Sequence, residues 1–321
     1  MARVLGLHHI TGISGDAQVN HDFYVGVLGM RLVKRSVNQD DPGTYHLFYA
    51  DDAGSPGTDL TFFPWTQMAR SRTGPGLTSE VLLAVPAGSL DAYWAPRLAA
   101  AGVATGDVET RRGERVLTLR DPHGLDLALA ETDDARDFTP WEASGVPPGH
   151  QIRGLHGARI LARTLAPTAD FLTGTFGLDA LGSEDVDSGG WHRFGIAGGA
   201  AGAGRSGTWI EVGEAPDAPT GVWGTGSIHH IAWRVADDAM QAGTRAAVDA
   251  AGRRPTPVID RFWFRSVYFT EPGGVVFELA TDGPGFAVDE NAATLGEALI
   301  LPPWLEPQRA AIEARLPRLD T

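Results

Sequence analysis

The 321-residue chain contains no cysteine, only four methionines, and fewer basic than acidic residues. Without cysteine there is no disulfide framework, and any bound metal must be held by nitrogen and oxygen ligands. No stretch approaches the roughly 18 apolar residues that indicate a membrane-spanning helix. The N-terminal sequence MARVLGLHHITG is patterned like a folded strand and lacks the layout of a signal peptide. We therefore expect a cytoplasmic protein.

The charge balance argues against two classes of partner. Lys and Arg number 26 against 40 Asp and Glu, which gives a formal net charge of −14. Nucleic acid and anionic membrane surfaces repel such a chain, so we expect neither as a partner. Hydrophobic residues make up 43% of the chain, enough for a substantial core, and the length fits about two domains.

The sequence contains an internal repeat. At a shift of 148 residues, GLHHITGIS matches GLHGARILA and DFYVGVLGMRL matches DFLTGTFGLDA; at a shift of 150, DPHGLDLALAE matches EPGGVVFELAT. The two halves therefore share one plan. The repeat predicts an N-terminal pair of modules at 1–147, a C-terminal pair at 148–285 and a helical tail at 286–321.

Each half divides again into two units in which one strand precedes a helix and further strands. In the first unit Val19, Phe23 and Val27 recur at helical spacing, and Ser89 and Gly102 delimit the helix of the second. Four such βαβββ modules predict an α+β fold in which two domains of curled mixed sheets surround a central cavity. In the tail, Pro302-Pro303 precede an expected helix of about a dozen residues.

Two histidine doublets, His8-His9 and His229-His230, lie in apolar runs of strand length. In the register of the repeat, His9 and His230 occupy the same position of the first strand, in the first and fourth modules. If both rings point the same way they converge on one point. This interpretation requires the first and fourth modules to meet in space.

A carboxylate can complete a metal site with these two histidines. Glu278 lies in the apolar run VVFELA, at a position that is Ala128 in the second module. An ionised carboxylate in a buried strand is costly unless it is paired or binds a metal. The set of His9, His230 and Glu278 leaves adjacent coordination positions open and suits a non-haem Fe(II) that activates oxygen, although Mn(II) or Zn(II) would also fit.

A second ligand set stays open. His156 aligns with His8, and a slip of one residue in a strand would turn it to the other face. His156 and Glu211, with His230 and Glu278, would form a site within the C-terminal half alone. The remaining histidines, which we interpret as structural, are His21, His46, His123, His150 and His192.

The motifs LHHIT (7–11), HHIAW (229–233) and EPGGVVFE (271–278) together resemble the vicinal oxygen chelate superfamily of glyoxalase, bleomycin-resistance and dioxygenase proteins. Within it the chain resembles the ring-cleaving dioxygenases of the hydroquinone type. The likeness extends to YHLFYADDAGSPGTDLTFFP and to LPPWLEPQR in the tail, and so covers nearly the whole chain. The resemblance implies paired βαβββ modules and an Fe(II) centre held by His9, His230 and Glu278.

The resemblance also implies the residues that surround these ligands, which are His8, Thr11, His229, Arg261 and Tyr268. Tyr268 has independent support, because a Pro272-Gly273-Gly274 connection would pair it with Glu278 across a hairpin. Arg265 lies on the same hairpin and is an alternative to Arg261.

The implied activity is that of an Fe(II)-dependent, extradiol-type dioxygenase that inserts both atoms of O2 into a hydroquinone- or catechol-type aromatic diol. His8 or His229 would supply a proton, and Tyr268 and Arg261 would orient the substrate oxygens. Candidates for the apolar wall are Phe62, Phe264 and Trp233.

Two other functions stay open. One is a metal-dependent isomerase or lyase of the glyoxalase type, with His156 and Glu211 as ligands. The other is a non-catalytic resistance protein that binds a ligand between modules, although an empty charged site would cost such a protein stability. Extensive edge strands are compatible with a homodimer.

Overall fold

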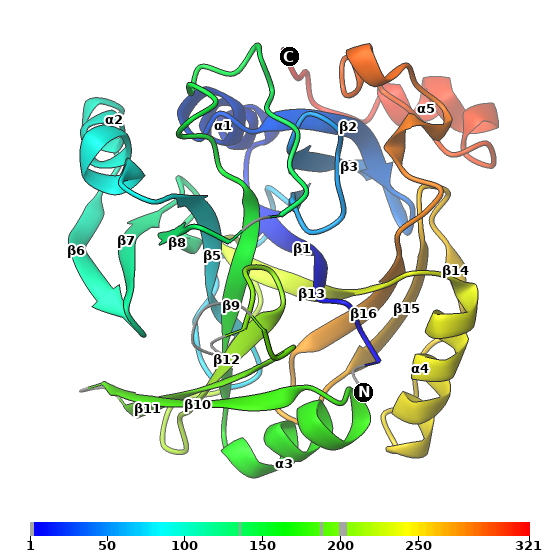
Figure 1. Cartoon of the computed structure of the whole chain (residues 1–321). Helices are drawn as coiled ribbons and strands as arrows, with labels where there is room; N and C mark the ends of the chain where they lie inside the picture. The colour runs from blue at the N-terminus through cyan, green and yellow to red at the C-terminus, as the bar shows by residue number, and fades with distance from the viewer. Residues whose placement is uncertain (1–2, 135, 187–188, 199–203) are drawn as a thin grey trace.

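The computed structural model describes residues 3–134, 136–186, 189–198 and 204–321, and two eight-stranded sheets dominate them (Figure 1). The first sheet has the strand order β14 (Ile259–Asp260), β15 (Arg265–Thr270), β16 (Val276–Thr281), β13 (Ser227–Val235), β1 (Leu7–Ser14), β4 (Asp59–Pro64), β3 (Asp41–Ala50), β2 (Arg31–Asn38). The second has the order β10 (Asp179–Val186), β11 (Gly189–Gly195), β12 (Trp209–Glu214), β9 (Gly154–Ala162), β5 (Thr78–Pro86), β8 (Asp126–Thr132), β7 (Glu114–Arg120), β6 (Thr105–Arg111).

One helical segment follows the first strand of each module. In the first three modules a short α-helix adjoins a π-helical turn: α1 (Ala17–His21) with η1 (Asp22–Val27), η2 (Leu90–Trp94) with α2 (Ala95–Ala100), and α3 (Leu165–Asp170) with η3 (Phe171–Thr175). The fourth module has the regular helix α4 (Asp238–Ala250). This order of elements confirms the predicted βαβββ modules and the α+β fold class.

The first sheet combines the first and fourth modules. Strands β1 and β13 pair antiparallel at its centre with Thr11 opposite His230, and each runs parallel to the last strand of its own module. In the second sheet β5 and β9 pair in the same way, with Glu80 opposite Arg159. The expected meeting of the first and fourth modules is confirmed. The boundaries at 147 and 285 follow the repeat and stay predictions, because each sheet takes one module from each half.

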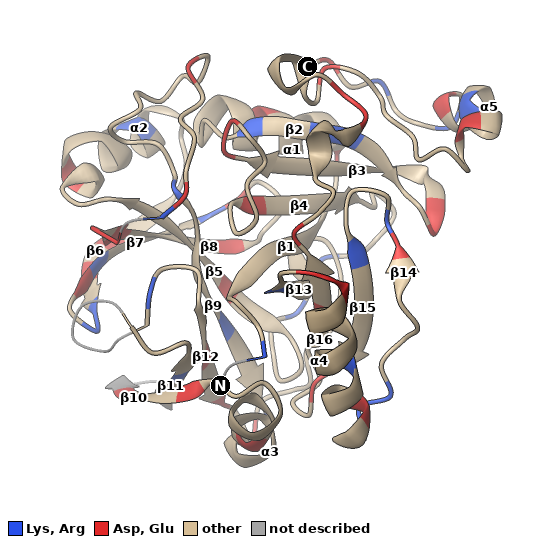
Figure 2. Cartoon of the chain, turned by 45° about the vertical axis from the view of Figure 1, so that its right-hand side comes forward, with Lys and Arg blue, Asp and Glu red and all other residues tan. Residues whose placement is uncertain are grey.

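Side chains along the central strands alternate between a face that packs in the core and a face that carries the predicted metal triad. Ile10, Ile231 and Phe277 are fully buried in the main hydrophobic cluster, and each adjoins one member of the predicted metal triad. Because side chains alternate between the faces of a strand, the face that carries the triad is opposite the core face. The strands β1, β4 and β13 carry few charged residues (Figure 2).

The C-terminal tail packs on the first sheet but is less helical than expected. It contains η5 (Phe286–Val288), η6 (Ala292–Thr294), η7 (Glu306–Gln308) and the five-residue helix α5 (Arg309–Glu313). The predicted helix of about a dozen residues was wrong: the α-helical part begins at Arg309, after the 3-10 turn that contains Pro307, and ends at Glu313, before Pro317. The fully buried Lys34 anchors the tail through ion pairs with Asp289 and Glu290. No helix among the described residues has the length and apolar character to cross a bilayer.

Candidate metal centre

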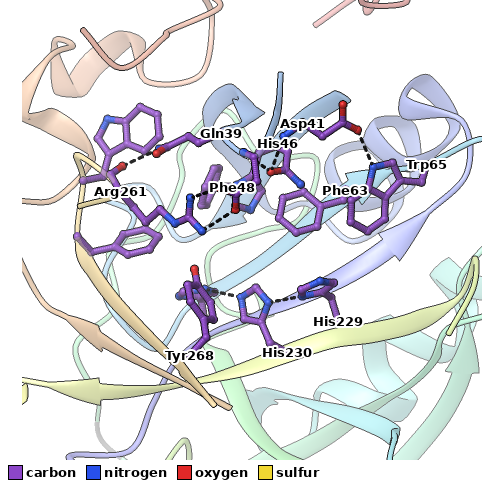
Figure 3. A pocket seen from close by; sticks show the side chains of 15 residues that line it. Gln39, Asp41, His46, Phe48, Phe63, Trp65, His229, His230, Arg261 and Tyr268 are labelled. Carbon is purple, nitrogen blue, oxygen red and sulfur yellow. Dashed lines mark hydrogen bonds and ion pairs between the residues drawn. The ribbon is translucent and has the colours of Figure 1, made fainter. Parts of the chain in front are cut away.

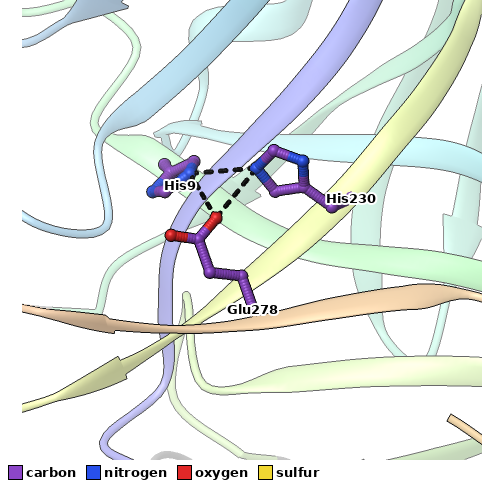
Figure 4. A group of neighbouring side chains, drawn as sticks. All are labelled: His9, His230 and Glu278. Atoms are coloured by element: carbon purple, nitrogen blue, oxygen red, sulfur yellow. Dashed lines mark hydrogen bonds and ion pairs between the residues drawn. The ribbon is translucent and has the colours of Figure 1, made fainter. Parts of the chain in front are cut away.

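Three side chains from three strands of the first sheet converge on one point (Figure 4). His9 Nε2 lies 3.2 Å from His230 Nε2 and 3.3 Å from Glu278 Oε2, and His230 Nε2 lies 2.9 Å from the same oxygen. All three residues are buried. The strand register brings them together, since β1, β13 and β16 are neighbours and present the three side chains on one face.

The spacing and chemistry of these atoms fit a first-row divalent ion. Donor atoms about 2.1 Å from an ion and at right angles to one another lie about 3.0 Å apart, close to the observed separations. Ser266 Oγ donates to Oε1 of Glu278, whereas Oε2 is buried and forms no hydrogen bond of good geometry with any described residue. Two imidazoles and one carboxylate are typical ligands of Fe(II), Mn(II) or Zn(II).

The first histidine of each doublet orients the second. His8 Nδ1 lies 2.9 Å from His9 Nδ1, and His229 Nδ1 lies 2.7 Å from His230 Nδ1. Burial and the neighbouring histidine lower the pKa of both His8 and His229 to about 3, so each is neutral and can accept a hydrogen bond. A hydrogen bond at Nδ1 leaves Nε2 of the paired ring free to bind an ion.

A cavity of about 300 Å³ adjoins the triad (Figure 3). Its aromatic lining consists of Phe48, Phe63, Trp65, Trp263 and Phe264. Its polar lining includes Asn38, Gln39, Asp40, Asp41, His46, His229, Arg261 and Tyr268. A cavity of this size with aromatic walls suits a small ligand built on one ring.

Two of the predicted site residues occupy the same end of the cavity. Tyr268 pairs with Glu278 across the β15–β16 hairpin, as the turn sequence predicted, and its ring centroid lies 5.6 Å from that of His230. Burial and the nearby Glu278 raise the pKa of Tyr268, so its hydroxyl keeps its proton. The Arg261 guanidinium lies 5.4 Å from the Tyr268 ring centroid, whereas Arg265 pairs with Asp238 outside the cavity. Arg261 is therefore the arginine that reaches the site.

The other predicted residues divide between the cavity and the core. His229 lines the cavity, while His8 is buried behind His9 and does not line it. Of the three residues considered for the apolar wall, Phe264 lines the cavity, and Phe62 and Trp233 are fully buried in the main core cluster.

The interpretation of His46 as a structural histidine was wrong. It lines the cavity, and its Nε2 lies 2.9 Å from Thr61 Oγ1, which in turn lies 2.8 Å from Thr11 Oγ1. Thr11 does not line the cavity and is connected to it only through its hydrogen bond to Thr61 and that of Thr61 to His46. His46 and Phe48 are two residues apart in β3 and therefore share a face, but residue order alone does not show that this face borders the cavity.

The structure does not assemble the alternative ligand set. His156 and Glu211 lie in the second sheet, where His156 pairs with Glu114, and Glu211 pairs with Arg112, Arg159 and Arg193. Burial disfavours ionisation of Glu211, but Arg193 and Arg159 outweigh it and hold the pKa of that carboxyl below its usual value. Across the described residues, His9, His230 and Glu278 form the only group of three His, Asp or Glu side chains whose donor atoms could reach one ion.

Comparison with known proteins agrees with the fold and the repeat. The family model described as the Glyoxalase/Bleomycin resistance protein/Dioxygenase superfamily matches residues 6–129 and again 154–279. The chain is 41% identical over 314 residues to the "Putative ring-cleaving dioxygenase MhqO" of Bacillus subtilis, across 98% of this chain and 96% of that protein. It is 33% identical over 312 residues to the "Chlorohydroquinone/hydroquinone 1,2-dioxygenase" of Sphingobium indicum, across 95% of this chain and 93% of that protein.

Two solved structures, one of high and one of low sequence identity to this chain, have a similar fold. The crystal structure of a "putative dioxygenase" from Bacillus subtilis superposes with a TM-score of 0.89 at 40% identity, covering 100% of this chain and 99% of that one. Glyoxalase I from Zea mays superposes with a TM-score of 0.62 at 15% identity, covering 86% of this chain and 92% of that one. The second likeness concerns the fold alone.

Proposed function

Because the chain belongs to the glyoxalase/bleomycin resistance protein/dioxygenase superfamily, we propose that it is an Fe(II)-dependent ring-cleaving dioxygenase that acts on a hydroquinone- or catechol-type aromatic diol. The observation that carries the proposal is a triad of two histidines and one glutamate beside an aromatic cavity of single-ring size. The names of the relatives, which include a ring-cleaving dioxygenase and a hydroquinone dioxygenase, support it. The reaction adds both atoms of O2 to the diol and opens the ring beside a hydroxyl, so it needs no further reductant.

His9, His230 and Glu278 would hold the metal. Fe(II) there supplies Lewis acidity toward a phenolic hydroxyl and reactivity toward O2. The remaining work falls to the cavity. The aromatic walls hold the ring by stacking and exclude water, which strengthens every polar contact inside.

Three polar side chains act on the substrate oxygens. The Tyr268 hydroxyl and the Arg261 guanidinium donate hydrogen bonds to oxygens that become negative during the reaction. His229 uses Nδ1 toward His230, whereas its Nε2 has no hydrogen-bond partner among the described residues, and its ring lines the cavity. Because a neutral His229 ring that accepts at Nδ1 carries its hydrogen on Nε2, this nitrogen is placed to donate a proton to a substrate oxygen that becomes negative.

The test is reconstitution of the full chain with Fe(II) without air, followed by oxygen-uptake measurements with hydroquinone and with catechol. We expect uptake of one O2 per diol consumed, and with ¹⁸O2 both labelled atoms in the ring-opened product. The Glu278→Gln variant is the control and should take up none. Absence of uptake with both diols, together with isomerase turnover of a glutathione hemithioacetal by the Zn(II)- or Ni(II)-loaded chain, would refute the proposal in favour of glyoxalase chemistry.

A further inference from the structure

The imidazole of His46 is held in a fixed orientation at the cavity wall. Its ring centroid lies 3.8 Å from that of Phe48 and 4.4 Å from that of Phe63, so two aromatic side chains pack against it. Its Nε2 is engaged by Thr61 at 2.9 Å. A ring restrained by two aromatic contacts and a hydrogen bond loses little entropy when it binds a ligand, which is typical of a recognition group.

The second nitrogen of His46 is available to a ligand. No described residue hydrogen-bonds Nδ1, and the half-buried side chain lines the cavity. The hydrogen bond to Thr61 sets the role of this nitrogen. If Nε2 accepts a hydrogen bond from Thr61, Nδ1 carries the ring hydrogen and donates; if Nε2 donates to Thr61, Nδ1 accepts. A phenolic hydroxyl can answer either arrangement, because it is both a donor and an acceptor.

Other polar side chains on this side of the cavity are already engaged. Gln39 donates to the Arg261 carbonyl, and Asp40 receives both terminal nitrogens of the Arg261 guanidinium. Asp41 accepts from Trp65 Nε1 and from Thr44 Oγ1. Among these groups, His46 has a ring nitrogen without a protein partner.

His46 faces the triad from across the cavity. Figure 3 shows His46, Phe48 and Phe63 along one side, and His229, His230 and Tyr268 along the other. Strand β4 separates β3 from β1 in the sheet, so the backbones of His46 and His9 lie on strands about 10 Å apart. An aromatic ring between the two sides can present one oxygen to the triad and another substituent to His46.

We infer that His46 Nδ1 hydrogen-bonds the substrate hydroxyl that the metal does not hold, and that Thr61 and Thr11 act as positioning residues for that ring. The inference rests on the proposed function, since it assigns a partner to the second hydroxyl of the diol. His46 thus selects diols over monophenols, and Thr11 contributes to substrate recognition without touching the substrate.

A double comparison of substrate and side chain tests this inference. The dissociation constants of hydroquinone and of phenol are measured by calorimetry on the Fe(II)-loaded full chain without oxygen, for the wild type and for His46→Leu. We expect His46→Leu to raise the dissociation constant of hydroquinone about tenfold, which corresponds to the loss of one hydrogen bond. The dissociation constant of phenol should rise less than about twofold. His150→Leu, which removes a half-buried histidine outside the cavity, should change neither constant.

The threonines provide a second measurement if His46→Leu folds poorly. Thr61→Val keeps the shape of the side chain but removes the hydroxyl, and we expect it to raise the hydroquinone constant several-fold with no effect on phenol. Thr61→Ser should restore wild-type binding. If the hydrogen bonds from Thr11 through Thr61 to His46 were merely structural, Thr61→Val would weaken the binding of phenol and of hydroquinone equally. Thr61→Ser would then fail to restore hydroquinone binding.

The outcomes separate the two proposals. If His46→Leu and Thr61→Val weaken the binding of hydroquinone and of phenol equally while the wild type still takes up oxygen, the role of His46 is overturned. The dioxygenase proposal then stays in place. If the wild type neither binds hydroquinone nor takes up oxygen with any diol, the dioxygenase proposal fails, and the inference about His46 fails with it.

Discussion

Replacing Glu278 by glutamine separates the proposed metal-binding role of the carboxylate from its role in the fold. The substitution keeps the shape of a fully buried side chain and an oxygen that can accept from Ser266. It removes the negative charge that faces Nε2 of His9 and of His230. Without metal, the partners of this carboxylate are imidazoles rather than fixed cations, so its loss leaves no permanent charge unpaired, and we expect the two apo-proteins to differ by no more than about 1 kcal/mol in free energy of unfolding.

With metal the two proteins should diverge. At a metal concentration 100 times its dissociation constant, binding stabilises the native wild type by about 2.7 kcal/mol. For 321 residues the unfolding entropy is about 0.7 kcal/mol per kelvin, so the wild-type melting temperature should rise by about 4 °C. Loss of a ligand should weaken metal binding more than the roughly 100-fold effect of losing a supporting residue, which leaves a rise of less than about 1 °C in Glu278→Gln.

The assay is differential scanning calorimetry with and without Fe(II) under anaerobic conditions, with metal content measured after dialysis. Glu271→Gln is the matched control, because Glu271 is an equally buried glutamate that accepts from the backbone amides of Gly273 and Val275. It should lower the melting temperature of both forms but keep the rise of about 4 °C. A full rise in Glu278→Gln would refute the assignment of Glu278 as a ligand.

Three further predictions address other parts of the molecule. His9→Ala should abolish bound metal after dialysis while His156→Ala retains it, as measured by elemental analysis; the reverse result would restore the alternative ligand set. Glu211→Gln should lower the free energy of unfolding by about 3–5 kcal/mol at pH 7, because it removes the buried negative charge that Arg112, Arg159 and Arg193 share. Since the folded-state pKa of Glu211 is depressed, its contribution is fully present above the ordinary carboxyl pKa of about 4.3 and is lost as the pH falls through the lower folded value, so denaturant titrations below pH 5 should show a flatter decline in the variant. Tyr268→Phe should lower kcat/KM for hydroquinone about 100-fold at unchanged metal content, and a loss of metal instead would assign Tyr268 to the support of Glu278.

The sequence predicted the triad because its members are fixed by strand register. His9 and His230 occupy equivalent positions in two modules, and the turn after Thr270 pairs Tyr268 with Glu278. These relations depend on local pairing and on the period of two along a strand, both of which are readable from residue order. The shared register of His9 and His230 also predicted that the first and fourth modules meet, which they do within one sheet.

The residues that the sequence did not identify depend on curvature and on contacts between distant segments. His46 reaches the cavity because the sheet curls, and Asp40 matters because it meets Arg261, 221 residues later. The three arginines around Glu211 come from separate strands and a turn, and no spacing in the sequence brings them together. The tail helix is shorter than Pro302-Pro303 suggested, since its α-helical part begins at Arg309 and ends at Glu313, before Pro317.

The order of modules along the chain also determines when the site can exist during synthesis. The second sheet uses the contiguous segment Thr78–Glu214, whereas the triad needs His9 and residues that follow it by 221 positions or more. At about 5–20 residues per second, His230 leaves the ribosome roughly 10–45 s after His9. The second sheet can therefore form before β13 has been synthesised and can pair with the edge of β1. A chain that stops before β16 would contain every strand of the second sheet but lack Glu278, so the triad can assemble only late in synthesis.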